Sequence, residues 1–137
     1  MKKTAVIYWS GTGNTEAMAN AVAEGMKEAG AEVAVMTPDQ VNSLNGYASI
    51  AFGCPAMGTE VLEEVDFQPM FDGCKNSLGG KSVALFGSYG WGDGEWMRNW
   101  EKDCEDAGVN LVCESVTCCE APDDAALSAC REMGKAL

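Results

Sequence analysis

Histidine is absent from the sequence and cationic side chains are scarce. Nine Lys and Arg stand against 21 Asp and Glu, which gives a formal net charge of −12. Phosphate backbones and anionic lipid headgroups repel a chain of this charge, so we expect no nucleic acid and no membrane surface among its partners. The charge favours partners that present a basic face.

Long hydrophobic runs are also missing. No stretch approaches the roughly 20 consecutive apolar residues that a membrane-spanning helix needs. The apolar stretch after Lys3 is interrupted at Ser10-Gly11, which makes it too short for the hydrophobic region of an export signal. We therefore expect a cytoplasmic protein.

The seven cysteines lack the spacing of a metal site or a disulfide framework. Their number is odd, and no two of them are separated by two residues. This excludes a disulfide scaffold, a zinc ribbon and a ferredoxin-type cluster, so no metal site is expected. We interpret the cysteines as small buried apolar residues of a reduced protein, with a redox pair at Cys118-Cys119 as the alternative.

The composition that is present fits one folded domain. A length of 137 residues, of which 47% are hydrophobic, supplies enough apolar material for a single core over residues 1–137. The hydrophobic patterns predict strands over 4–9, 32–36, 48–53, 82–87 and 109–118, and helices over 15–29, 67–78, 94–107 and 123–136. The polar pair Glu114-Ser115 is the place where the last strand would break. Strands that alternate with helices indicate a doubly wound α/β fold with a five-stranded parallel sheet.

The loop after the first strand has the composition of a phosphate site. It reads Ser10-Gly11-Thr12-Gly13-Asn14-Thr15 and leads into a predicted helix. Its glycines permit a tight turn with exposed N–H groups, and the helix N-terminus adds partial positive charge. The lysine of a nucleotide triphosphate loop and the third glycine of a dinucleotide fingerprint are both missing. A monophosphate held by neutral donors remains, with a helix cap that binds no ligand as the alternative.

The loops after the third and fourth strands should open beside the first. They span 54–60 and 87–94. Trp91 lies between two glycines that cannot cover it, and Met57 offers a thioether that suits the face of an aromatic ring. The three loops together suggest a flat, phosphorylated aromatic cofactor. The alternative is that Trp91 and Met57 only cap the end of the sheet.

Three motifs in this order resemble the flavin-binding loops of short-chain flavodoxins from anaerobic bacteria. They are Tyr8 to Glu16, Gly53 to Gly58 and Phe86 to Gly92. The resemblance runs through nearly the whole chain and implies a flavodoxin-like fold with strand order 2-1-3-4-5. It also implies non-covalently bound FMN as the cofactor.

The resemblance places FMN on particular residues of this chain. It puts the phosphate on Ser10 to Thr15, the ring between Met57 and Trp91, and the pyrimidine edge against Glu60 and the backbone of Ser88 to Gly92. The implied cofactor-binding residues are Ser10, Gly11, Thr12, Gly13, Asn14, Thr15, Pro55, Ala56, Met57, Gly58, Thr59, Glu60, Ser88, Tyr89, Gly90, Trp91 and Gly92. No catalytic residue is implied.

The chain departs from the family pattern at two places. The β-branched Thr59 follows Gly58, the glycine at which the family turns a peptide toward the flavin, and it restricts that turn. We therefore expect the semiquinone to form but to be less dominant than usual. Cys119-Glu120 stands near the place where the family has an asparagine beside the pyrimidine.

The resemblance implies a low-potential one-electron carrier and not an enzyme. The family cycles FMN between semiquinone and hydroquinone and donates electrons to redox enzymes in place of ferredoxin. None of the three loops contains Lys, Arg or His. One like charge about 9 Å from the reduced ring costs roughly 2 kcal/mol at an effective dielectric near 20, or about 80 mV for one electron. Several such charges make a strong reductant.

The carrier is expected to be a monomer that docks transiently on basic-faced reductases or oxidoreductases. Carboxylates around the exposed flavin edge would steer this docking. The carboxylates expected around this edge are Glu60, Glu63, Glu64, Asp66, Asp93 and Glu95.

Two alternative functions have the same order of elements. An FMN-dependent NAD(P)H:quinone reductase needs room for nicotinamide over the ring, which Trp91 would occupy. A response-regulator receiver domain needs acidic residues after the first strand and an aspartate after the third. This chain has Ser10-Gly11 and Cys54 at those positions.

Overall fold

Apolar strands form a single sheet at the centre of the molecule. The computed structural model describes residues 2–57, 61–90, 92 and 94–137. Its strands are β1 (Lys3–Tyr8), β2 (Glu32–Met36), β3 (Ser49–Gly53), β4 (Ser82–Tyr89), β5 (Asn110–Leu111) and β6 (Val116–Cys119). All pair in parallel, in the order β2-β1-β3-β4-β5, with β6 also paired to β4. The predicted fold class and strand order are confirmed.

The fifth predicted strand is divided into two pieces. β5 pairs with Ser82 and Val83 at the start of β4, whereas β6 pairs with the end of β4. Ser115 lies between the two strands, and its hydroxyl donates a 2.8 Å hydrogen bond to the Glu101 carboxylate on α3. The break lies where the sequence predicts it, and β6 is one strand more than predicted.

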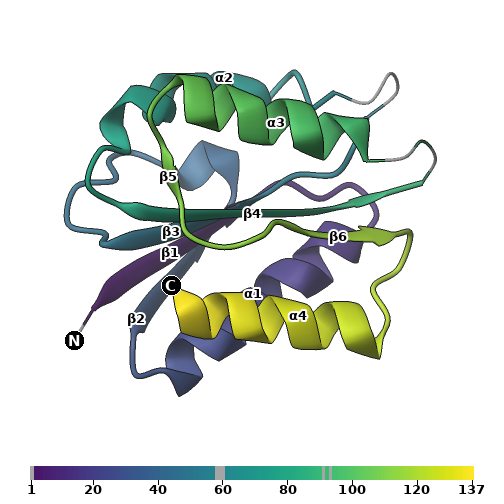
Figure 1. Ribbon diagram of the computed structural model, residues 1–137, viewed down its shortest axis with the longest axis horizontal. Coiled ribbons are helices and arrows are strands. Elements are labelled where there is room, and N and C mark those ends of the chain that lie inside the picture. The colour runs from purple at the N-terminus through teal and green to yellow at the C-terminus, as the bar shows by residue number, and fades with distance from the viewer. Residues whose placement is uncertain (1, 58–60, 91, 93) are drawn as a thin grey trace.

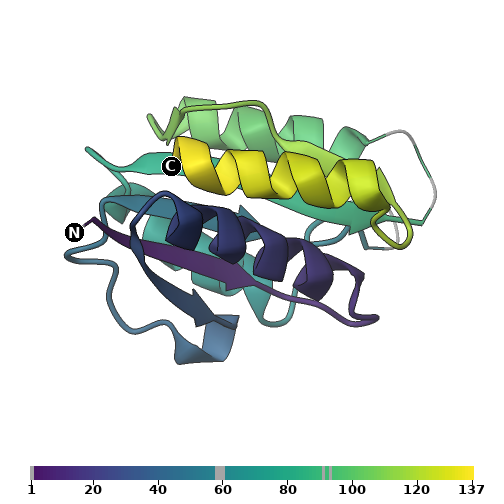
Figure 2. The ribbon, with the colours of Figure 1, turned by 90° about the horizontal axis from the view of Figure 1, so that it is seen from below.

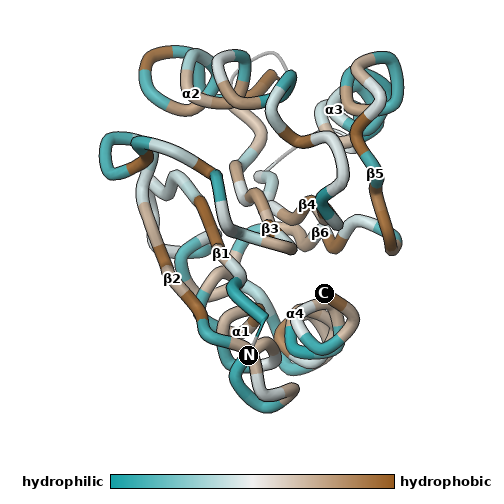
Figure 3. Tube along the Cα trace, turned by 90° about the vertical axis from the view of Figure 1, so that its left-hand side faces the viewer, coloured by the Kyte–Doolittle hydropathy of each residue, from teal (hydrophilic) through white to brown (hydrophobic). Residues whose placement is uncertain are grey.

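Two pairs of helices cover the two faces of the sheet. One face carries α1 (Asn14–Glu28) and α4 (Asp124–Ala136), which lie side by side in Figure 2. The other carries α2 (Phe67–Cys74) and α3 (Glu95–Asp106), so that the molecule has three layers (Figures 1 and 3). Each helix coincides with a segment predicted to be helical, except that α1 begins one residue earlier, at Asn14.

Apart from shifts of one residue, the elements differ from the prediction at three places. The helix predicted over 67–78 ends at Cys74, and a 3-10 turn follows over Lys75–Ser77. β4 continues two residues beyond the predicted end, to Tyr89. A 3-10 helix over Pro38–Gln40, closed by a capping box from Thr37, has no counterpart in the prediction.

Aromatic side chains fill the core beneath α2 and α3. Phe52 meets Phe71 edge to face, with ring centroids 5.1 Å apart. Trp100 meets Phe67 and Phe71 in the same way at 5.4 and 5.6 Å. These geometries are favourable for aromatic pairs and fix α2 against α3 and the sheet. No helix in the described ranges is long and apolar enough to cross a membrane.

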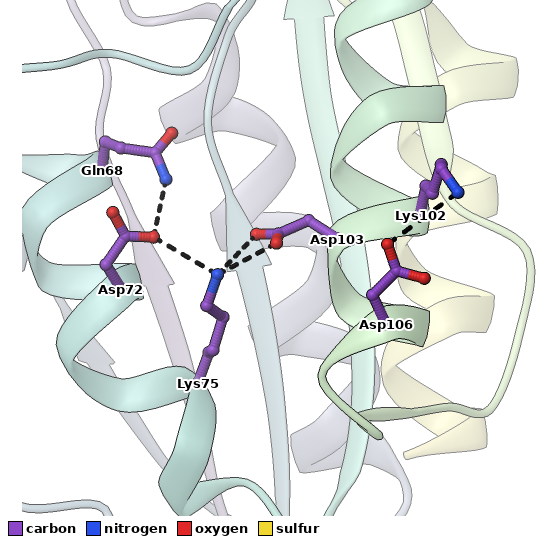
Figure 4. A network of polar contacts seen from close by, with 6 residues as sticks. All are labelled: Gln68, Asp72, Lys75, Lys102, Asp103 and Asp106. Atoms are coloured by element: carbon purple, nitrogen blue, oxygen red, sulfur yellow. Dashed lines mark hydrogen bonds and ion pairs between the residues drawn. The ribbon is translucent and has the colours of Figure 1, made fainter.

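A polar network joins α2 and α3 at the surface (Figure 4). The Lys75 ammonium lies 2.9 Å from Asp103 Oδ1 on α3 and 3.7 Å from Asp72 Oδ1 on α2. The hydrogen bond to Asp103 and the neighbouring carboxylates raise the pKa of Lys75. Because the group is partly exposed, the pair contributes no more than about 1 kcal/mol to the free energy of folding.

Candidate functional site

Three loops meet at one end of the sheet, where β1, β3 and β4 end side by side (Figure 1). A cavity of about 320 Å³ opens between them. It is lined by Trp9, Gly11, Thr12, Asn14, Pro55, Ala56, Met57, Ser88, Tyr89, Gly90 and Glu120. The carboxyl ends of parallel strands are the usual ligand sites of such sheets.

The first loop turns sharply into α1 and presents backbone donors. Gly13 has a φ of 94°, a left-handed conformation that glycine adopts without steric cost. Its N–H donates to the Ser10 hydroxyl at 3.0 Å. In this loop five backbone N–H groups donate to no other residue in the described part of the chain, namely those of Ser10, Gly11, Thr12, Asn14 and Thr15.

The same loop does not cap its own helix. Gly13 occupies the N-cap position of α1, and no side chain caps the N–H groups of the first helical turn. The N-terminal N–H groups of a helix carry partial positive charge and need an acceptor. The alternative of a Ser/Thr-rich cap therefore lacks the hydrogen bond that would define it, and the donor set fits a phosphate.

A buried pair of hydroxyls joins the first loop to the third. Thr15 Oγ1 and Ser88 Oγ lie 3.0 Å apart, and the two residues are 1% and 4% exposed. The pair fixes the first turn of α1 against the end of β4. The phosphate loop and the wall of the cavity thus hold a constant relative position.

The remaining walls of the cavity are mainly apolar. The Trp9 ring lies against Gly11 so closely that a Cβ at Gly11 would lie 3.0 Å from the indole. Met57, on the second loop, also lines the cavity. The neighbouring Ala56 N–H donates to the Ser88 carbonyl at 3.0 Å. Apolar walls with a few polar groups at one end suit a flat aromatic ring with a polar tail.

The charged residues around this region are all acidic. A second cavity of about 460 Å³ adjoins the first loop and shares Trp9 and Gly11 with the first cavity. The charged residues among those that line the two cavities are Glu16, Asp39, Asp66 and Glu120. Tyr8 donates a 3.0 Å hydrogen bond to Glu16, and burial together with this carboxylate raises the pKa of the phenol.

The structure brings together most of the predicted cofactor-binding residues that it describes. Eleven of these line one of the two cavities: Ser10, Gly11, Thr12, Gly13, Asn14, Pro55, Ala56, Met57, Ser88, Tyr89 and Gly90. Thr15 and Gly92 line neither cavity, although the Thr15 N–H belongs to the donor set and the Thr15 hydroxyl is bonded to that of Ser88. Gly58, Thr59, Glu60 and Trp91 lie outside the described residues, as does the docking carboxylate Asp93.

Two residues that line the cavity were named in the sequence analysis but not included among the predicted cofactor-binding residues. Trp9 follows β1 directly, and Glu120 follows β6 at the same end of the sheet. Glu120 has a φ of 58°, the one positive value of a non-glycine residue in the described part of the chain, and its N–H donates to the Tyr89 carbonyl at 2.6 Å. The prediction placed Trp9 inside the first strand, whereas β1 ends at Tyr8 and leaves Trp9 at the carboxyl end of the sheet.

One predicted docking carboxylate is corrected by its burial. Glu63 is only 6% exposed, and its carboxylate accepts three backbone hydrogen bonds. It is therefore not a solvent-exposed group that a partner could contact. Glu64, Asp66 and Glu95 are exposed as predicted.

The cysteines differ in environment. Cys54, Cys104 and Cys130 are fully buried, and burial raises the pKa of each thiol to about 12. Cys119 is exposed, and none of the seven is in a disulfide. Within the described ranges, no group of three or more His, Cys, Asp or Glu could hold a metal ion.

Comparison with known proteins identifies the family. The flavodoxin family model matches residues 6–134. The flavodoxin of Megasphaera elsdenii is 46% identical over 134 residues, which cover 96% of this chain and 95% of that protein. The flavodoxin of Clostridium beijerinckii is 43% identical over 134 residues, which cover 96% of this chain and 96% of that protein.

A solved structure agrees with these matches. The solution structure of two-electron reduced Megasphaera elsdenii flavodoxin superposes with a TM-score of 0.89 at 44% identity, over 97% of this chain and 96% of that one. The resemblance inferred from three loops is confirmed, and so is the expectation of a carrier and not an enzyme. The chain belongs to the flavodoxin family of FMN-binding electron-transfer proteins.

Proposed function

We propose that this chain holds FMN in the cavity between its three loops. The observation that carries the proposal is a donor set suited to a phosphate, the unpaired N–H groups of the first loop and the first turn of α1, at the end of a mainly apolar cavity of about 320 Å³. Ser10 to Thr15 would hold the phosphate. Met57, Ala56 and Tyr89 would form walls for the ring, with Trp91, Gly58, Thr59 and Glu60 as further contacts predicted by the resemblance.

The bound FMN would supply one-electron chemistry at low potential. The proposed cycle runs between the semiquinone and the hydroquinone, so that the protein donates electrons to redox enzymes in place of ferredoxin. The support is electrostatic. The charged residues among those that line one or the other cavity are carboxylates. Their negative field disfavours the addition of negative charge to the ring.

The partners we propose are basic-faced reductases or oxidoreductases. A formal net charge of −12 favours transient docking on a positive surface. Glu64 and Asp66 are exposed beside the loops and would take part in it. We further propose that residues 1–137 form one domain, which acts as a cytoplasmic monomer.

The test is a visible spectrum of the purified protein during stepwise anaerobic reduction. We expect a yellow protein whose spectrum passes through semiquinone bands before it bleaches. The restricting side chain of Thr59 should make those bands weaker than in relatives with a less hindered residue there. Complete reduction without any such bands would contradict the one-electron cycle. Steady NAD(P)H consumption by the protein alone would favour the quinone reductase instead.

A further inference from the structure

The chain segment after β3 returns to α2 through a paired stem. Met57 and Val61 form an isolated antiparallel bridge, in which the N–H of each donates to the carbonyl of the other at 2.8 and 3.2 Å. Met57 lines the cavity, whereas Val61 does not. The position of the Met57 wall therefore depends on what holds Val61 and the residues that follow it.

Glu63 anchors the outgoing arm of this stem. Its carboxylate accepts the backbone N–H groups of Val65, Asp66 and Phe67 at 2.9, 2.8 and 2.8 Å. Asp66, the N-cap residue of α2, makes no side-chain cap hydrogen bond of its own. Glu63, three residues before the N-cap residue Asp66, thus caps the start of α2 in its place. Hydrogen bonds to an ionised carboxylate are short and strong.

Two further contacts tie Glu63 to the incoming arm. The Glu63 N–H donates to Cys54 Sγ at 3.3 Å, and the Cys54 carbonyl accepts the Trp96 indole N–H at 3.1 Å. Cys54 and Trp96 are both buried, so this chain of contacts lies inside the fold. Both arms of the stem are consequently fixed at their base, between β3, α2 and α3.

The ionisation of Glu63 fits this arrangement. Burial by itself would raise the pKa of the carboxyl, but the three backbone N–H donors outweigh it and lower the pKa overall. The group is therefore charged at neutral pH although it is nearly excluded from solvent. A buried charge of this kind is retained only where its hydrogen bonds are complete.

We propose that Glu63 is a positioning residue for the flavin site: by capping α2 it fixes the arm that pairs with Met57, and so holds the cavity wall against which the ring packs. The inference rests on the proposed function. The role comes from the buried hydrogen bonds of Glu63 and not from its charge, because the neighbouring Glu64 has the same charge but is exposed.

The test compares Glu63→Gln with the matched control Glu64→Gln. Each variant removes one negative charge from the same segment, but only Glu63→Gln replaces a carboxylate oxygen that accepts backbone N–H groups at the start of α2. The apoproteins are titrated with FMN and with riboflavin, and the midpoint potentials of the loaded proteins are measured. A looser ring wall should affect both ligands alike, because riboflavin lacks the phosphate.

We expect Glu63→Gln to weaken FMN and riboflavin by the same factor of about ten, the equivalent of one net hydrogen bond. Its midpoint potential should shift further than that of Glu64→Gln, which should bind both ligands within about twofold of the wild type. Glu63→Asp keeps the charge on a shorter side chain and should fall between the two. It also supplies the comparison if Glu63→Gln folds poorly.

Equal affinities and potentials for Glu63→Gln and Glu64→Gln would overturn the inference, because charge alone would then explain both. A Glu63→Gln or Glu63→Asp variant that melts at lower temperature but binds both ligands as the wild type does would also overturn it, since the cap would then be purely structural. A wild-type protein that binds no FMN would refute the proposed function itself. That result is distinct from the two results that would overturn the role of Glu63.

Discussion

A single glutamate shows how strongly surroundings decide the role of a residue. In the sequence Glu63 stands in an acidic stretch and has the pattern of a solvated surface charge. In the structure it is buried and accepts three backbone N–H groups. Gly13 is the opposite case, because a glycine between a strand and a helix already indicates the left-handed turn that it adopts.

The lowered pKa of Glu63 predicts a pH dependence of stability. A carboxyl whose pKa is lower in the folded state stabilises the fold above its ordinary value, about 4.3, and loses this contribution as the pH falls through its folded pKa. Glu63→Gln should therefore lower the free energy of unfolding by about 2 kcal/mol at pH 7. In urea titrations, this difference from the wild type should shrink toward pH 3.

The exposed Glu64→Gln variant serves as the control and should change the free energy of unfolding by less than about 0.5 kcal/mol at both pH values. A Glu63→Gln deficit that is as large at pH 3 as at pH 7 would refute the ionised cap.

Among the elements, the α1 and α4 pair depends on two glycines that let the helices approach. A Cβ at Gly134 would lie 2.1 Å from the Val22 carbonyl oxygen, and one at Gly25 would lie 2.0 Å from the Arg131 carbonyl oxygen. Such contacts are far below any allowed separation, and the obstacle is backbone, which cannot rotate away. The positions of the elements were predictable because apolar runs and helical periodicity mark them.

Gly134→Ala should destabilise the protein by about 1 to 3 kcal/mol, because the added methyl group must force the helices apart. Gly73→Ala in α2 is the matched control, since a Cβ there meets nothing within 4 Å. The control should leave stability unchanged or raise it by up to about 1 kcal/mol, because alanine has the higher helix propensity. Thermal unfolding of the two variants measures both changes, and equal stability would contradict the close contact.

The contacts between elements were less accessible to the sequence than the elements themselves. The short helix at Pro38 depends on local capping, and the Ser115 bond to Glu101 lies at the break of the last strand, whose position but not whose contact the sequence indicates. These interactions join residues whose pairing no periodicity reveals. Trp9 and Glu120 likewise share the cavity only because the strand order places the ends of β1 and β6 at the same end of the sheet.

For the whole molecule, the motif-bearing loops were predictable because the order of strands in a doubly wound sheet brings particular carboxyl ends together. Ser10, Met57 and Tyr89 lie at or beyond the carboxyl ends of three strands far apart in sequence, and they line adjoining cavities as expected. The charge is likewise a property of the whole chain, and its sign is visible from composition alone.

This charge predicts that electron transfer to a basic partner slows as salt is added. Between about 0.01 and 1 M ionic strength the screening length falls from roughly 30 to 3 Å, which removes long-range steering. Asp66→Asn, beside the loops, should reduce the salt dependence of the second-order rate constant. Glu32→Gln is the control, because Glu32 is exposed at the start of β2, toward the opposite end of the sheet. Stopped-flow rates that do not vary with ionic strength would exclude electrostatic steering.

The most direct test of the account is the affinity of the apoprotein for FMN compared with that for riboflavin, measured by the quenching of flavin fluorescence. If the N–H groups of the first loop and the first turn of α1 hold a phosphate, FMN should bind at least about a hundredfold more tightly, the effect of roughly two hydrogen bonds to a charged group. Equal affinities, or no binding of either flavin, would contradict it.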